Sequence, residues 1–331
     1  MKTVSLVATG NMPTDITEGV LVRKSGLPVV LFAAMAAAVP AHAETLPIEA
    51  VYPAGSDNLA ILNTLRMGSF NGRDGSSLAL ELEQQLRNVS VRGEAYYQIF
   101  VGGGGPRADG TVTGSAYSSV ENNVEIVQET ECVAKNDKGK CIEKRVVNIR
   151  CTRRSVTLTY TLSVVSPRGE RLYSMSKPSV TSNLICPQTY NVAPVEVVIA
   201  SLISNAAREL RFEFAPAQVR TDIRVKEGTS GLQGAAKKTF KNGIAATKRN
   251  VASACKLWTE VDYLVPNHAP TLFNLGLCAE SDRDYDKAEQ LYRRTAELDR
   301  SERYATESLE RLARRRKAEQ QLAMHASRRT R

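Results

Sequence analysis

The sequence predicts an α+β protein, with a mixed sheet, flanking helices and long β-hairpins, followed by an all-α domain of helical repeats. Three observations support this fold class. Residues 112–185 are rich in Val, Thr, Tyr and Ile, the composition of strands. Leucines at four-residue spacing in 76–88 give the stripe of a helix that packs on a sheet. After residue 234 the pattern is helical throughout and repeats at about 34 residues.

The first elements of the α+β part follow from short patterns. Apolar residues at alternate positions near the end of 58–67 predict a strand. The helix at 76–88 has Asp74 or Ser76 as its N-cap, since both side chains can accept a bond from the first turn. A second strand is predicted at 96–101.

The middle of the chain is predicted to form long strands, at 112–117, 124–134, 141–150, 155–165 and 171–185. In 155–165, apolar residues alternate with Ser and Thr, so one face of that strand is buried and the other is wet. An antiparallel meander is the simplest assembly. Helical periodicity returns at 194–211, with Pro194 in the permitted first turn, and a last strand follows at 219–225.

Residues 26–43 have the order of a cleavable export signal. Arg23 and Lys24 precede an apolar run that ends in Ala41-His42-Ala43, the small-x-small pattern of a cleavage site. The alternative is a membrane anchor or a buried helix, but the run is shorter than the roughly 20 residues that span a bilayer. No Cys follows the run, so a lipid anchor is not expected. The predicted location is periplasmic or secreted.

The six cysteines fit such a compartment. They contain no C-x-x-C spacing, which argues against zinc ribbons and redox motifs. An even number in an exported protein favours disulfides, with buried free thiols as the alternative. The two members of each neighbouring pair are equidistant from a predicted turn, and a strand bulge would spoil this register argument. The predicted pairs are Cys132 with Cys141, Cys151 with Cys186, and Cys255 with Cys278.

The net charge of +9 is concentrated at the end of the chain, where residues 311–331 hold eight basic residues and one acid, Glu319. Nucleic acid is not expected as a partner outside the cytoplasm. The run is either a charged helix or a contact for acidic polymers such as peptidoglycan or anionic outer-membrane lipid. The candidate contact residues are Arg314, Arg315, Arg316 and Lys317.

The helical third carries a repeat motif. Five positions match the spacing of one 34-residue unit and its predecessor, and the alternative is an ordinary helical hairpin. These positions are Gly276, Ala288, Tyr292, Trp258 and Pro266. By this motif, the region resembles tetratricopeptide repeat proteins, which bind other proteins.

The part from about Ile61 to Val225 resembles a second group by its element order. The strand ending in the run from Arg66 to Gly72, the helix after Ser76, and the late helix into Phe214-Ala215-Pro216 are similar to the envelope α/β domain of curli-export lipoproteins, lipoprotein activators of penicillin-binding proteins, and the N-terminal domain of TolB. This resemblance implies a protein-binding role in the cell envelope. The chain departs from the group because it lacks the lipid-bearing Cys and has cysteines in its hairpins.

Catalytic motifs are not evident. His268 and His325 are the histidines outside the predicted signal, and neither sits in a nucleophile–base pattern. We therefore expect no enzyme activity, no metal and no cofactor. A cell-wall hydrolase with dispersed carboxylates is one alternative, since such pairs have no fixed spacing. An oligomeric secretion-assembly component is the other.

The predicted function is that of an exported periplasmic adaptor, which binds an envelope protein through its helical repeats in envelope or outer-membrane assembly. The candidate partner-binding residues are Leu272, Asn274 and Tyr292 in the helical part, with helix packing as their alternative role, and Arg73 and Asp74 in an exposed turn. The predicted divisions of the chain are a signal peptide at 1–43, an N-terminal extension at 44–57, an α/β envelope domain at 58–226, a linker at 227–234, a tetratricopeptide-like domain at 235–326 and a basic tail at 327–331.

Overall fold

A computed structural model describes residues 44–102, 107–189, 191–299 and 303–329. The predicted signal and its cleavage site lie outside these residues. Among the helices described, none is both long and apolar enough to cross a membrane.

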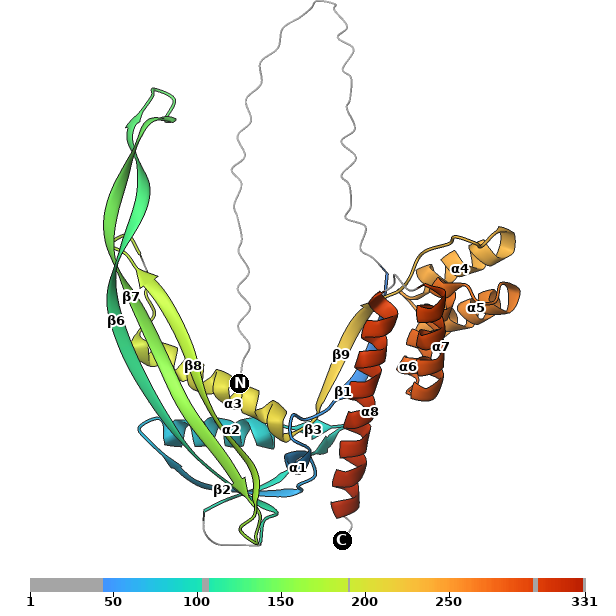
Figure 1. Cartoon of the computed structure of the whole chain (residues 1–331), viewed down its shortest axis with the longest axis horizontal. Helices are drawn as coiled ribbons and strands as arrows, with labels where there is room; N and C mark the ends of the chain where they lie inside the picture. Colours follow the sequence, from blue (N-terminus) through green and yellow to red (C-terminus); the bar gives the residue numbers. More distant parts are fainter. Residues whose placement is uncertain (1–43, 103–106, 190, 300–302, 330–331) are drawn as a thin grey trace, which may run out of the picture. The chain divides into compact units, whose positions relative to one another are not determined.

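A five-stranded mixed sheet forms the centre of the first part of the chain, which confirms the predicted sheet (Figure 1). Its strand order is β5(Gln98–Val101), β2(Thr64–Asn71), β6(Gly110–Lys135), β7(Cys141–Val165) and β8(Arg171–Ile185). β2 runs parallel to both β5 and β6, whereas β6, β7 and β8 form the predicted antiparallel meander.

Helices α2(Gly75–Arg87) and α3(Val195–Phe214) share one hydrophobic core with this sheet. The leucine stripe Leu78, Leu82 and Leu86 is fully buried. On β7 the even-numbered residues from Val156 to Val164 are buried, because successive side chains of a strand point to opposite faces. The even-numbered positions of β7 therefore define the helix-bearing face of the sheet.

Two details of the strand prediction were wrong. The predicted strand at 58–67 begins with a helical turn, α1(Asp57–Ala60), because the Ser56 hydroxyl caps it by accepting a bond from the Leu59 N–H at 3.4 Å. The pairs of strands expected within 112–134 and within 141–165 are single long strands. Their polar middles pair with each other in register, as in Asn122 with Arg154, so neither strand is interrupted.

The predicted N-terminal extension contains a strand that the sequence analysis missed. β1(Thr45–Tyr52) pairs antiparallel with β9(Ala217–Arg224), in a ribbon separate from the main sheet. Leu46 and Ile48 of β1 are buried among the C-terminal helices, and Val51 belongs to the core of the sheet. A short hairpin of β3(Ser90–Val91) and β4(Glu94–Ala95) precedes β5.

The last third of the chain is helical, as predicted, with α4(Gly234–Ala246), α5(Val251–Leu264), α6(Ala269–Ser281), α7(Tyr285–Leu298) and α8(Arg303–Arg329). The same kind of close contact occurs twice in this helical part. A methyl group on Gly243 would collide with the Trp258 ring, and one on Gly276 would collide with the Tyr292 ring. Glycine therefore lets α4 approach α5, and α6 approach α7, in the same way.

The predicted linker 227–234 is anchored rather than loose. The amide of Asn274 bonds both backbone groups of Lys226, at 2.8 and 2.9 Å, and Leu232 is buried. Residues 327–329 of the predicted basic tail are helical instead, because α8 continues to Arg329. One stripe of α8 is buried along its whole length, from Ala305 to His325.

Candidate functional site

Three disulfides are present, and they join the predicted partners: Cys132–Cys141, Cys151–Cys186 and Cys255–Cys278. Thr152 lies opposite Ile185, the register that symmetry predicted for the second pair. The register predicted for the first pair was wrong, since Cys141 lies opposite Lys135 and a bulge at Ala134 shifts the strand. Three disulfides indicate a protein of an oxidising compartment outside the cytoplasm.

The β6–β7 hairpin extends well past the end of β8, as Figure 1 shows in green. The last pair between β7 and β8 is Thr152 with Ile185, whereas β6 and β7 continue to the turn after Lys135. We call residues 124–152 the arm. The Cys132–Cys141 disulfide joins its two strands near the tip.

The two faces of the arm differ in charge. The acids of β6 between 121 and 131 all occupy odd-numbered positions, and the odd-numbered face also holds the ion pair of Glu125 with Arg153 at 2.6 Å. The even-numbered face carries Lys144 and Arg150 and no acid between 122 and 134 or between 142 and 154. This even-numbered face of the arm continues the helix-bearing face of the sheet.

Aliphatic side chains on the even-numbered face of the arm are exposed. The relative exposure is 57% for Val124, 60% for Ile126 and 61% for Val146. Farther down the same face of β7, Val156 and Leu158 are at most 1% exposed under the helices. Aliphatic side chains on this face are therefore exposed on the arm, although the same face of β7 is buried farther down.

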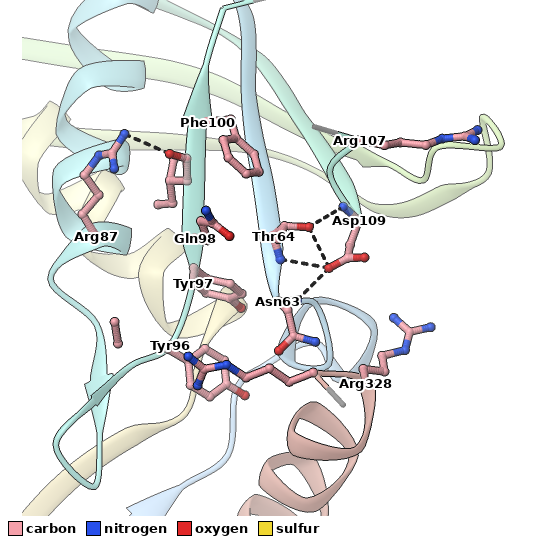
Figure 2. A pocket seen from close by; sticks show the side chains of 13 residues that line it. Asn63, Thr64, Arg87, Tyr96, Tyr97, Gln98, Phe100, Arg107, Asp109 and Arg328 are labelled. Carbon is pink, nitrogen blue, oxygen red and sulfur yellow. Dashed lines mark hydrogen bonds between the residues drawn. The ribbon is translucent and has the colours of Figure 1, made fainter. Parts of the chain in front are cut away.

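A second feature is a groove of about 860 Å³ along the edge strand β5 (Figure 2). At its floor, one carboxylate oxygen of Asp109 accepts bonds from the backbone N–H groups of Asn63 and Thr64 and from the Thr64 hydroxyl, each at 2.9 Å. On one side, Arg87 donates to the Ile99 carbonyl at 3.1 Å. Figure 2 shows Arg107 and Arg328 on the other side, with Asp109 between them. We call this hollow the β5 groove.

The three partner-binding candidates of the helical part lie in its core. Leu272 is 5% exposed, and Asn274 and Tyr292 are fully buried. The Tyr292 hydroxyl donates to Glu280 at 2.6 Å, and burial, followed by the nearby Glu280 carboxylate, raises the pKa of Tyr292 well above its ordinary value. Their burial favours the alternative role predicted for them, which is packing between helices.

Arg73 and Asp74 lie in the turn before α2, and both bond to β6. The Asp74 carboxylate accepts the Ser118 N–H at 2.7 Å, and the Arg73 guanidinium donates to the carbonyl and hydroxyl of Ser118. Asp74 occupies the N-cap position, as predicted, but without a capping side-chain bond. The exposed side chain of Arg73 remains available for contact, whereas Asp74 is nearly covered.

The basic cluster of α8 is largely paired. Arg315 is fully buried, with Nη1 at 2.6 Å from the carboxylate of Glu280, so placing it among residues that contact a polymer was wrong. Arg316 pairs with Asp286 at 2.7 Å, and Lys317 with Asp57 at 3.1 Å. Arg314 is exposed. The helix uses its charges mainly to join neighbouring elements.

The end of α8 docks on the α/β part through two buried polar side chains. The amide of Gln321 accepts the Ala54 N–H at 2.8 Å and donates to Asp57 at 2.6 Å. His325 stacks on Tyr96 with ring centroids 4.0 Å apart and bonds the Tyr96 carbonyl at 3.0 Å. Burial lowers the pKa of His325. In the described ranges, no group of three or more His, Cys, Asp or Glu residues could hold a metal ion.

No protein-family model matches the chain, and no curated protein matches it. Among solved structures, the chain is similar to a neuraminyllactose-binding hemagglutinin homolog from Helicobacter pylori, with a TM-score of 0.26 and 9% sequence identity. That match covers 48% of this chain and 82% of the other. A likeness of this extent supports no argument about fold or function, and the two family resemblances stay predictions.

Proposed function

We propose that this protein is an exported adaptor of the cell envelope, which holds a partner protein through the even-numbered face of the arm. The observation that carries the proposal is the exposure of Val124, Ile126 and Val146 on a face that is buried farther down the same strands. Full burial of an aliphatic side chain contributes about 1.5–3 kcal/mol, so covering all three would supply much of a binding energy.

The charge of the arm favours one kind of partner. Lys144 and Arg150 lie on the same face as the exposed aliphatic residues, while the acids of β6 point to the opposite face. Helices already cover this face lower in the sheet. An amphipathic helix with acidic residues beside its apolar stripe would extend the helical layer and complement the two cations.

The helical part fits an adaptor as a second module of tetratricopeptide type. The support is the recurrence of a glycine against an aromatic ring, Gly243 with Trp258 and Gly276 with Tyr292, about one 34-residue period apart. Its contact surface uses residues other than the buried motif positions. Tyr263, at 86% exposure, and its exposed neighbour Leu264 are the candidates that replace them.

Site-specific photo-crosslinking in cells tests the proposal. A photoreactive amino acid at Ile126 or Val146 should trap one partner, identified by mass spectrometry, and the same probe at the exposed Glu131 of the opposite face should not. Ile126→Asp should abolish the cross-link formed from Val146. Equal labelling from Glu131 and Ile126 would refute docking on this face.

Three further outcomes separate the alternatives. A cross-link formed from Tyr263 and not from the arm would keep the adaptor function and move the contact to the helical part. Digestion of purified sacculi by the protein would favour the cell-wall hydrolase instead. An oligomer in analytical ultracentrifugation that dissociates on Ile126→Asp would make the partner a second copy and favour the assembly component.

A further inference from the structure

Arginines from three distant segments converge beside the β5 groove. Arg107 precedes β6, Arg168 lies in the turn between β7 and β8, and Arg328 is near the end of α8. A second hollow, of about 600 Å³, adjoins the groove and shares Arg107, Asp109 and Arg328 with it. The two hollows therefore form one longer channel.

These three arginines have no acidic partner among the residues that the structure describes. The Arg107 guanidinium donates to the carbonyl of Pro167 at 3.0 Å, which leaves its charge uncompensated. Two acids, Asp109 and Glu170, also line the two hollows, so the three arginines exceed the acids there by one charge. By contrast, Arg87 and Arg329, which also line the groove, are paired with Glu83 and Glu94.

We propose that this channel binds an extended acidic peptide segment of another protein. Unpaired guanidinium groups gathered around a hollow attract anions, and their planar fork fits a carboxylate. Two adjoining hollows require a ligand with several carboxylates along its length. The first of the two hollows follows β5, an edge strand of the sheet, and edge strands accept extended polypeptide.

This site is separate from the arm and goes beyond the proposed adaptor contact. It also moves the contact for acidic polymers, which the sequence predicted on α8, to a different set of arginines. The residues concerned are Arg328, together with Arg107 and Arg168 of the α/β part, rather than Arg315 to Lys317, whose charges are paired within the protein.

Fluorescence anisotropy with a fluorescein-labelled deca-glutamate peptide at low salt tests the proposal on the full mature chain. The triple variant Arg107→Gln, Arg168→Gln, Arg328→Gln should bind the peptide about tenfold more weakly, as expected for the loss of three exposed ion pairs. A matched control removes the same charge from exposed sites of the helical part, Arg249→Gln, Lys256→Gln and Arg314→Gln. The control should keep its affinity within about twofold.

The single variant Arg328→Glu provides a second measurement with little risk to folding, because the side chain is exposed near the end of α8. It should also weaken peptide binding. Equal affinity of the groove triple variant and its control would overturn the proposal. It would also be overturned if phosphatidylglycerol vesicles bound through these arginines while deca-glutamate did not. Ile126→Asp should leave deca-glutamate binding intact, so a failure here is distinguishable from a failure of docking on the arm.

Discussion

Apolar side chains are usually buried and charged or polar side chains exposed, but the arm and α8 both depart from this rule. The even-numbered face of the arm carries aliphatic residues, yet Ile126 and Val146 are exposed. α8 has the composition of a solvated basic helix, yet Arg315 is fully buried and Gln321 and His325 are almost completely covered. In both elements the sequence pattern defines a distinct face. The two elements differ in what lies against that face.

This difference shows that a periodic sequence pattern identifies one face of a strand or helix. The pattern does not show which other element covers that face. The exposed face of the arm lacks a covering helix within the described residues. α8 meets a complementary surface instead, because Glu280 of α6 and Asp57 of α1 supply partners for its cations. Buried charges need such partners, whereas exposed valines carry a smaller penalty.

The largest expected effect concerns the buried carboxylate of Glu280. Glu280→Gln leaves the guanidinium of Arg315 buried without a counter-charge, which should lower the free energy of unfolding by about 3–5 kcal/mol. Urea unfolding followed by circular dichroism measures this change. The exposed Glu310 provides the control, since Glu310→Gln should change the free energy by less than about 0.5 kcal/mol.

A double variant checks the interpretation. Adding Arg315→Met to Glu280→Gln should restore part of the lost stability, because the uncompensated charge is removed. If the two substitutions destabilised the protein additively, the ion pair would not explain the burial of Arg315.

An intermediate effect is expected from pH. Burial lowers the pKa of His325, and also of His268, below the ordinary value of 6.5. The folded state therefore prefers neutral histidine, so the free energy of unfolding should fall as pH decreases from about 6.5 toward the lowered pKa values. Around His325, Asp109 raises the pKa and Arg329 lowers it.

His325→Phe, which preserves an aromatic ring beside Tyr96, should flatten this pH dependence below about pH 6.5. Urea titrations at several pH values measure the slope. His268 should account for the slope that remains. An unchanged slope in the His325→Phe variant would mean that the histidine is protonated freely and that the end of α8 is not tightly docked.

Several parts of the fold were predictable because their signals are local. The leucine stripe of α2, the Ser/Thr alternation of β7 and the turn-centred cysteine pairs depend on residues close in sequence. β1 was missed because its pairing partner is β9, at the other end of the α/β part. α1 was missed because the alternating residues Leu65 and Met67 belong to β2, whereas the helical turn before it depends on the cap at Ser56.

The candidate sites were predicted less well, for a related reason. Nothing near Arg107, Arg168 or Arg328 in the sequence indicates that they line one channel, because three separate elements bring them together. Repeat motifs pointed to Asn274 and Tyr292, but motif positions record packing between helices. The useful signal for a contact on the arm was the position of the acids of β6 on one side of the strand, which the prediction did not use.

The smallest change in the free energy of unfolding is expected from substitutions on the arm, in contrast to the change expected for α8. Ile126→Thr and Val146→Thr should each change the free energy of unfolding by less than about 0.5 kcal/mol, because the side chains are already exposed. Opening the tip disulfide with Cys132→Ser and Cys141→Ser should cost less than opening the disulfide at the base, because the tip disulfide closes a shorter loop, with a sequence separation of 9 against 35. Opening Cys151–Cys186 at the base of the arm, where β8 ends, should lower the free energy of unfolding by about 2–4 kcal/mol. Thermal and urea unfolding of these variants would show whether the arm belongs to the cooperative core. A loss at the tip as large as that at the base would mean that the arm is covered within the protein itself, and its aliphatic face would no longer be open to a partner.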